Sequence, residues 1–269
     1  MVGRNESSGA MFLWRSEMIL LLDIGNTHTH VALANDRRVT RHRDLPTSGW
    51  KGDASPRSLK AMVGRSRIDA IVFCSVVPDV VPLVRRALKS VSTLPPLELT
   101  AANIAGVGVD YPRPDTIGAD RLANAIAARH HFGCPSVVVD FGTAVTFDVV
   151  DRGGSYIGGI IAPGLAAMTD YLHEKTALLP RITIREPRSV VGRSTREAML
   201  VGAVHGYRGL IKELIGKLQG QLDVRRLPVI ATGGYARLIS RSLREITVVE
   251  PLLTLEGLRL FHGFHRGRP

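Results

Sequence analysis

Cysteine, aromatic residues and long apolar segments are all scarce in this 269-residue chain. The two cysteines, Cys74 and Cys134, are too few for a disulfide scaffold, so a reducing, cytoplasmic setting is expected. No apolar run reaches the length of a membrane-spanning helix, and we therefore expect no membrane partner. Apolar residues still make up 45% of the chain, which is enough for a packed core.

Acidic residues are fewer than basic ones, 24 against 35, which gives a formal net charge of +11. Such a charge can attract a nucleic-acid backbone. The arginines, however, are scattered along the chain, and aromatic residues amount to only 5% with no interleaved pattern. We therefore expect no nucleic-acid partner and assign part of the charge to attraction of small anions.

Residues 1–17 form a polar segment that contains Gly and Ser and precedes a good start position at Met18. The segment lacks the sustained apolar stretch and the small-residue cleavage site of a secretory signal. We interpret it as an extension, a mis-assigned start or an added remnant, and expect it to be disordered.

One pattern occurs twice: a buried strand, an aspartate, a glycine and a hydroxyl-bearing residue. The first copy spans Leu20–Thr27 and the second Val137–Thr146. Glycine lets the backbone approach a ligand closely, exposed NH groups and a threonine hydroxyl can hold a phosphate, and the aspartate can hold a cation. A turn-stabilising aspartate would explain either copy alone. The repeat favours the functional interpretation, in which two similar halves face one phosphate chain.

Apolar patterning predicts an α/β chain in which each half begins with three strands and continues with alternating helices and strands. Expected strands are 18–23, 29–34, 38–43, 70–75, 97–100, the two within 137–148, 156–161, 229–232 and 247–250. Expected helices are 58–64, 78–90, 122–130, 164–176, 194–216, 235–240 and 254–263, with loops at 45–54 and 105–114. The halves are predicted to be 18–134 and 135–269.

The segment Gly118–Arg121 places an acid and an arginine together at a predicted helix start. Alone, it fits an N-terminal helix aspartate beside a solvated arginine. In a phosphotransfer site, Asp120 can instead take a proton from an attacking hydroxyl, and Arg121 can bind a carboxylate at two points. The turn Thr232–Gly234 also allows two interpretations. It is either a plain strand-to-helix turn or a contact for a phosphate or for adenosine.

Five motifs in this order closely resemble those of type III pantothenate kinases, of the acetate/sugar kinase–Hsp70–actin superfamily. They are Asp23–Thr27, Gly118–Arg121, Asp140–Ala144, Gly158–Gly164 and Thr232–Gly234. The resemblance covers Met18 to about His262 and implies two ribonuclease-H-like (actin-like ATPase) halves with an interdomain cleft. It also implies a homodimer formed largely by the second half, and ATP-dependent phosphorylation of pantothenate to 4'-phosphopantothenate, the first committed step toward coenzyme A.

The same resemblance implies roles for particular residues. The ATP contacts would be Asp23, Ile24, Gly25, Asn26, Thr27, His28, Thr29, His30, Thr143, Gly233 and Gly234. The pantothenate contacts would be Tyr111, Gly118, Ala119, Asp120, Arg121 and, from across the dimer interface, Thr195. Asp120 would be the catalytic base and Arg121 would hold the pantothenate carboxylate. Asp140 would bind a monovalent cation, K⁺ or NH₄⁺, while Mg²⁺ would bridge the phosphates through water near Asp23.

Two features leave alternatives open. His28 and His30 stand where the family often has other residues; no third ligand accompanies them, so a metal pair is not favoured. Some family members resemble non-catalytic transcriptional accessory factors, and a kinase of another small hydroxylated metabolite is a further alternative. The presence of Asp23, Asp120 and Asp140 together favours catalysis.

Overall fold

Two β-sheets with the same topology form the framework of the molecule. The protein is described by a computed structural model that covers residues 17–267. The first sheet has the strand order β3-β2-β1-β4-β5, and the second has β11-β10-β7-β8-β9-β6. Apart from β6, the second sheet repeats the first, with the same antiparallel and parallel pairings at matching places. The two similar halves predicted from the repeated turn are therefore confirmed.

The elements follow closely the order expected from apolar patterning. The strands are Ile19–Ile24 (β1), His28–Ala34 (β2), Val39–Pro46 (β3), Ala70–Ser75 (β4), Leu97–Glu98 (β5), Gly108–Val109 (β6), Ser136–Phe141 (β7), Ala144–Val150 (β8), Ser155–Pro163 (β9), Val229–Thr232 (β10) and Val248–Val249 (β11). The α-helices are Ala54–Val63 (α1), Val81–Leu88 (α2), Ala119–Phe132 (α3), Leu165–Lys175 (α4), Thr195–Val201 (α5), Tyr207–Gln221 (α6), Ala236–Ser240 (α7) and Leu253–His265 (α8). Within residues 17–267, none of these helices is both long and apolar enough to cross a membrane.

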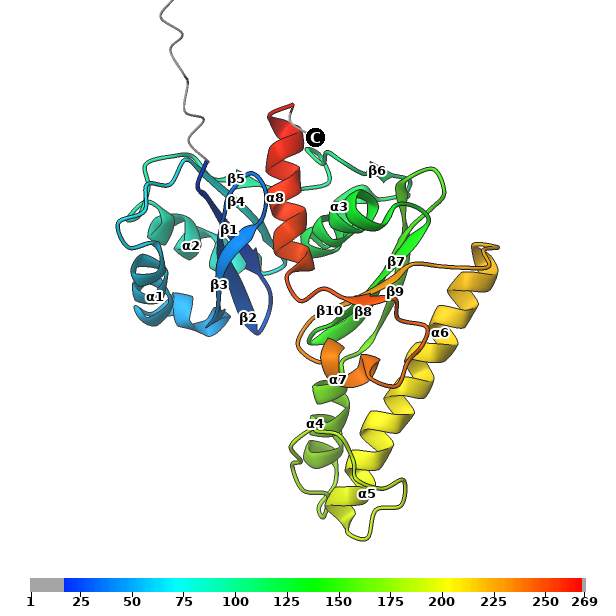
Figure 1. Ribbon diagram of the computed structural model, residues 1–269. Helices are drawn as coiled ribbons and strands as arrows, with labels where there is room; N and C mark the ends of the chain where they lie inside the picture. Colours follow the sequence, from blue (N-terminus) through cyan, green and yellow to red (C-terminus); the bar gives the residue numbers. More distant parts are fainter. Residues whose placement is uncertain (1–16, 268–269) are drawn as a thin grey trace, which may run out of the picture.

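Helices α3 and α8 form a middle layer between the two sheets (Figure 1). One continuous apolar cluster joins Leu21 and Val72 of the first sheet, Ile126 of α3, Phe261 of α8 and Val138 of the second sheet. The first sheet with α1 and α2 is called the first lobe below, and the second sheet with α4 to α7 the second lobe. Because α3 contacts both sheets and α8 packs on α3 and on the first sheet, burial of this shared core holds the lobes together.

Each lobe covers the outer face of its sheet with its own helices. In the first lobe, Leu59 of α1 and Val84 of α2 pack with Phe73 of β4. In the second lobe, Ile211 of α6 packs with Phe147 of β8. The alternation of strand side chains between these outer clusters and the middle layer explains why nearly every residue of β1 and β7 is buried.

Several predicted boundaries were wrong. Strand β3 does not end at 43 but runs through Pro46 into a 3₁₀ turn, Thr47–Lys51; Pro46 is tolerated because β3 is an edge strand. Helix α1 begins earlier than predicted, at Ala54. The predicted loop 105–114 contains β6, and a π-helical turn, Gly202–Gly206, interrupts the predicted helix 194–216.

Two segments also cross the boundary predicted between residues 134 and 135. Strand β6 pairs with β9 of the second sheet, and α8 packs on the first sheet. The boundary itself stays a prediction.

The predicted disordered extension lies outside the described residues except for Glu17, whose carboxylate contacts Arg266 of the C-terminal region.

Candidate active site

The two acidic turns meet between the lobes. The first turn follows β1 and is closed by the Gly25 amide, which donates to the His28 carbonyl at 3.0 Å. The second lies between β7 and β8. The hydroxyl oxygens of Thr27 and Thr143, 116 positions apart in the chain, are 3.0 Å from each other. Both hydroxyls are exposed, so they are accessible to a ligand placed between the turns.

The two aspartates occupy equivalent places in their sheets. Asp23 has His30 of β2 and Cys74 of β4 as its direct neighbours. Asp140 has Thr146 of β8 and Thr232 of β10 in the matching positions. The sequence repeat is therefore a structural repeat, with both carboxylates at the same edge of their sheets.

Four carboxylates repel one another at this junction. Burial, followed by the charge of Asp120, raises the pKa of Asp23 to about 6. Burial and the charges of Asp120, Asp23 and Asp148 raise the pKa of Asp140 to about 7. Such shifts mean that negative charge is poorly compensated by the chain itself. A bound cation would therefore be favoured at the junction.

Asp120 is held at the first turn of α3. Its Oδ1 accepts a hydrogen bond from the backbone amide of Arg121 at 2.8 Å. A Cβ at Gly118 would lie 2.6 Å from this same oxygen, so glycine is required for the carboxylate to adopt this position. Burial raises the pKa of Asp120 above its usual value. A partly buried carboxylate with a raised pKa is suited to accept a proton near neutral pH.

Arg121 is held by the neighbouring sheet. Its Nε donates to Oδ1 of Asp148 at 2.5 Å, and its Nη2 donates to the Phe147 carbonyl at 3.2 Å. Asp148 is completely buried, and burial raises its pKa to about 6 although Arg121 opposes the shift. The pair fixes the guanidinium, whose Nη1 makes no hydrogen bond within the described part of the chain and is available to a ligand.

Asn124 connects the parts of the site. Its Nδ2 lies 3.4 Å from Oδ2 of Asp140 and 3.4 Å from Oδ2 of Asp148. Its Oδ1 accepts from the Thr254 hydroxyl of α8 at 2.8 Å. A single buried amide thus contacts both carboxylates and the helix that joins the lobes.

The predicted phosphate loop divides into accessible and internal residues. Asn26, Thr27 and His28 are exposed, whereas the side chains of Ile24 and Thr29 are completely buried. The Thr29 hydroxyl contacts that of Thr47 at 3.1 Å and accepts from the indole of Trp50 at 2.9 Å. Thr29 therefore supports the turn from inside the lobe, and its hydroxyl is not free for a nucleotide.

His30 lies partly buried beside this loop, with its Nδ1 2.7 Å from Oδ1 of Asp44. Its ring centroid is 6.4 Å from that of His28. Among residues 17–267, no three His, Cys, Asp or Glu side chains are grouped to hold a metal ion.

The turn after β10 packs directly on the second acidic turn. Gly233 has a φ of +87°, and a Cβ there would lie 2.5 Å from Oδ1 of Asp140 and 2.7 Å from the Phe141 backbone. Only glycine fits such a conformation without strain. Gly234, by contrast, has open space around it. The third predicted nucleotide motif therefore lies against the second.

The predicted pantothenate residues are only partly brought together. The ring of Tyr111 is 6.1 Å from that of Tyr156, over which the Arg121 guanidinium lies at 5.6 Å. Gly118 and Ala119 lead directly into α3. Thr195, however, begins α5 at the far end of the second lobe, well away from α3 (Figure 1).

Comparison with known proteins agrees with this arrangement. A family profile described as type III pantothenate kinase matches residues 19–217. The type III pantothenate kinase of Akkermansia muciniphila is 48% identical over 247 residues, covering 91% of this chain and 98% of that protein. The one from Methylacidiphilum infernorum is 41% identical over 248 residues, covering 90% and 87%. The chain belongs to the type III pantothenate kinase family.

Solved structures agree on the fold. A Campylobacter jejuni protein described as a Baf family transcriptional activator matches with a TM-score of 0.59 and 19% identity, over 92% of this kinase-family chain and 99% of its own. MreB 5 of Spiroplasma citri bound to AMPPNP matches with a TM-score of 0.51 and 11% identity, over 94% and 98%. At these identities the likeness concerns the fold alone, and it confirms the two-lobed α/β architecture.

Sequence reasoning missed three residues of the candidate site: Asn124, Asp148 and Tyr156. Asn124 lies among apolar neighbours on the predicted helix 122–130, and Tyr156 begins the predicted strand 156–161, so neither gave a functional signal. Asp148 offered a signal, because a lone acid within the apolar run of β8 is costly unless it is paired.

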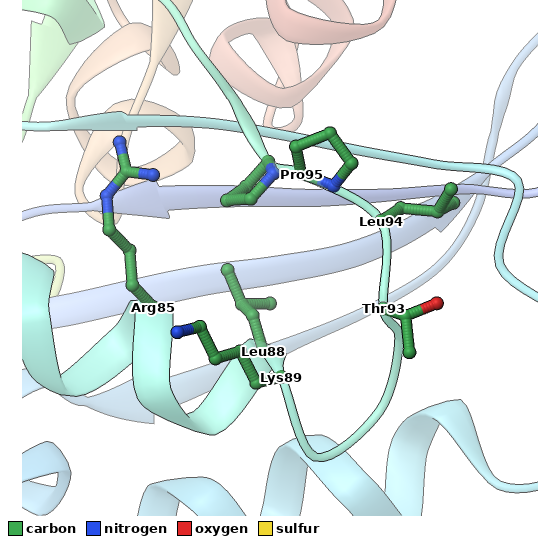
Figure 2. Close-up of a pocket in the computed structure, with 7 residues that line it drawn as sticks. Arg85, Leu88, Lys89, Thr93, Leu94 and Pro95 are labelled. Atoms are coloured by element: carbon green, nitrogen blue, oxygen red, sulfur yellow. The ribbon is translucent and has the colours of Figure 1, made fainter.

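A hollow elsewhere on the first lobe is a different kind of surface. Figure 2 shows it between α2 and the segment before β5, lined by Arg85, Leu88, Lys89, Thr93, Leu94, Pro95 and Pro96. Arg85 is already paired with Glu98 at 2.6 Å, and none of the lining side chains is acidic. This hollow lacks the groups needed for phosphoryl transfer.

Proposed function

We propose that this protein transfers the γ-phosphoryl group of ATP to the primary hydroxyl of pantothenate, with Asp120 as the base. Membership of the type III pantothenate kinase family makes it an ATP-dependent pantothenate kinase that acts in coenzyme A biosynthesis. The observation that carries the residue assignment is the meeting of the two acidic turns, Thr27 beside Thr143, at the carboxylate cluster that includes Asp120. Phosphoryl transfer depends mainly on positioning and on neutralisation of charge, and this junction supplies the positions.

ATP would lie along the exposed part of the first turn and the Thr143 turn. The exposed residues Asn26, Thr27 and His28 would meet the phosphates. Ile24 and Thr29 contribute through the backbone, because their side chains are internal. Gly233, which packs on Asp140, and the neighbouring Gly234, which has open space around it, would receive the remaining part of the nucleotide.

Pantothenate would bind against Tyr111 and the start of α3. Asp120 would orient the primary hydroxyl and accept its proton as the phosphorus–oxygen bond forms. The pairing of Arg121 with Asp148 changes the expectation for Arg121. Because its charge is compensated inside the protein, we propose that its Nη1 meets a neutral oxygen of pantothenate in place of the carboxylate.

The donor set at the junction fits hard cations. A monovalent cation, K⁺ or NH₄⁺, would be held by Asp140, whose carboxylate has no cationic side chain beside it in the sheet. Mg²⁺ would arrive with ATP and be held through water near Asp23. When bound, these ions would supply charge neutralisation. Residues 17–267 contain no group of three His, Cys, Asp or Glu side chains that could hold a metal alone, so substrate oxygens would complete the coordination.

A homodimer would complete the pantothenate site. Seven large apolar side chains of the second lobe are exposed between positions 161 and 191, namely Ile161, Met168, Tyr171, Leu172, Leu178, Val190 and Val191. A concentration of this kind is typical of a protein interface. It leads directly to Thr195 at the start of α5, and α5 lies far from α3 of the same chain (Figure 1). We propose that a second copy covers this surface and brings its own Thr195 to the pantothenate carboxylate.

The rival functions have less support. A transcriptional accessory role would leave the carboxylate cluster without a purpose, and a neighbour described in such terms shares only 19% identity. A kinase of another metabolite would keep the cluster but differ at Tyr111 and Tyr156. A cytoplasmic location and the lack of a nucleic-acid partner remain our predictions.

The deciding experiment is a coupled assay of ADP release with ATP and Mg²⁺. We expect release that depends on pantothenate and rises when K⁺ or NH₄⁺ is added. A panel of other small hydroxylated metabolites serves as the control. ADP release that requires a different alcohol, or none with any alcohol, would contradict the proposal.

A further inference from the structure

The hydroxyl group of Tyr156 is an unexplained polar group at the site. Three side-chain oxygens in the described residues are buried without a hydrogen-bond partner, those of Ser136, Tyr156 and Ser240. Tyr156 is completely buried, and it is the member of this set that lies beside the candidate pantothenate residues. A buried hydroxyl that makes no hydrogen bond is costly, and therefore indicates a missing partner.

The surroundings of Tyr156 point to the substrate. The Arg121 guanidinium lies over its ring, with a distance of 5.6 Å from Cζ to the ring centroid, and Tyr111 meets its edge at 6.1 Å. The charged groups that act on the hydroxyl are Asp148 of β8 and Asp120 and Arg121 of α3. Every one of these neighbours either belongs to the pantothenate site or holds a residue that does.

The hydroxyl keeps its proton and can act as a donor there. Burial, reinforced by the nearby charge of Asp148, raises the pKa of Tyr156 well above its usual value. The phenol thus stays protonated at any physiological pH. A ligand that brings an acceptor can therefore complete its hydrogen bonding.

We propose that Tyr156 donates a hydrogen bond to a neutral oxygen in the pantoyl half of pantothenate, its amide carbonyl or its secondary hydroxyl. This inference rests on the proposed function. It adds a specificity-determining residue to the pantothenate site, deeper than Tyr111, which is partly exposed.

The charges at the site favour a neutral oxygen. Asp148 and Asp120 contribute two negative charges near the hydroxyl, and Arg121 contributes one positive charge that is already paired with Asp148. A carboxylate brought to the same place would be repelled. The pantoyl oxygens carry no charge, and they lie within a few bonds of the primary hydroxyl that Asp120 would activate.

Tyr207 provides a matched control. It is also buried, but its hydroxyl donates to the Pro163 carbonyl at 3.2 Å, on the other side of the second sheet. Tyr156→Phe therefore removes a hydroxyl that has no partner in the free protein, whereas Tyr207→Phe breaks a structural hydrogen bond. The two variants should behave in opposite ways.

The experiment measures pantothenate KM, kcat and the thermal midpoint of the ligand-free protein for both variants and the wild type. For Tyr156→Phe we expect KM to rise about tenfold with kcat changed about twofold or less, and a thermal midpoint equal to or above that of the wild type. Tyr207→Phe should lower the midpoint and leave KM within about twofold. An unchanged KM, or a lowered midpoint without a change in KM, for Tyr156→Phe would overturn the inference.

A second arm identifies the acceptor. Calorimetry with pantothenol, in which an alcohol replaces the carboxylate, measures binding without turnover. Tyr156→Phe should weaken pantothenol and pantothenate equally, by about tenfold. Weakening of pantothenate alone would assign the contact to the carboxylate and overturn the neutral-oxygen inference.

The two proposals can fail separately. If the wild type releases no ADP with pantothenate, the proposed function fails; if only the Tyr156 effects are missing, this inference alone fails.

Discussion

The first and second acidic turns share a backbone plan but differ in the side chains beside their aspartates. Across the first sheet, Asp23 stands in a row with Asp44, His30 and Cys74. His30 is a potential cation in that row, and Cys74 Sγ donates to Asp23 Oδ1 at 3.4 Å.

Across the second sheet, the matching row is Ile161, Thr146, Asp140 and Thr232. No side chain of this row is cationic. The pKa of Asp140 is raised to about 7, compared with about 6 for Asp23. The comparison shows that the duplicated turns have diverged: the first places a histidine beside its aspartate, whereas the second has no cationic side chain there, and we propose that a cation binds at the second.

Exchanging each aspartate for asparagine tests this difference most strongly. Asp140→Asn removes the charge that would hold the monovalent cation, so we expect kcat/KM to fall on the order of 100-fold and the residual rate to become independent of K⁺. Asp23→Asn should also slow turnover but keep its dependence on K⁺. Initial rates over a K⁺ titration measure both effects. The assignment is wrong if Asp23→Asn loses the K⁺ dependence and Asp140→Asn keeps it.

A smaller effect is expected at Gly233, which packs on the second turn, and Gly234 beside it provides the control. In Gly233→Ala, the new methyl group would lie 2.5 Å from Asp140 Oδ1 at a φ of +87°. We expect a loss of about 1–3 kcal/mol in the free energy of unfolding. Gly234→Ala has open space at the same turn and should leave the stability nearly unchanged. Denaturant titration of the two variants compares them, and equal stabilities would contradict the packing described here.

The smallest effect concerns pH. Asp140, Asp23 and Asp148 all have raised pKa values, of about 6 to 7, against about 4 in an unfolded chain. Between these values the folded protein binds more protons than the unfolded chain, so its stability falls as the pH rises. Without K⁺, we expect the thermal midpoint to drop by about 5 °C from pH 5 to pH 8.

Asp140→Asn serves as the control for this pH effect, because it should flatten the fall. Added K⁺ should restore the midpoint of the wild type at pH 8 more than at pH 5. A midpoint that rises from pH 5 to pH 8 without K⁺ would show that the aspartates are not held in an uncompensated cluster.

Strong local patterns made much of the fold predictable. The run of apolar residues at Ala70–Ser75 gave a strand with the predicted boundaries, and the repeated turn correctly indicated two related sheets. Strand β6 could not be predicted, because Gly108–Val109 has only two residues and depends on its pairing with β9. The position of α8 was equally hidden, since apolar spacing does not say which sheet a helix covers.

The candidate site was predictable where chemistry and backbone signals coincide, as at Asp23, Asp120 and Asp140. It was not predictable where a role depends on contacts between elements distant in the chain. Asn124 and Asp148 are 24 positions apart, and Asn124 and Thr254 are 130 apart. Thr29 illustrates the opposite case, because a residue within a phosphate-loop motif turns its side chain into the lobe.

The central claim is that the two turns hold the phosphates while Asp120 activates the alcohol. The most direct measurement compares Asp120→Asn with the wild type in pantothenate-dependent ADP release and in ATP binding by calorimetry. We predict a fall in kcat of about 10²- to 10⁴-fold with ATP affinity retained. Normal turnover by Asp120→Asn would contradict the account.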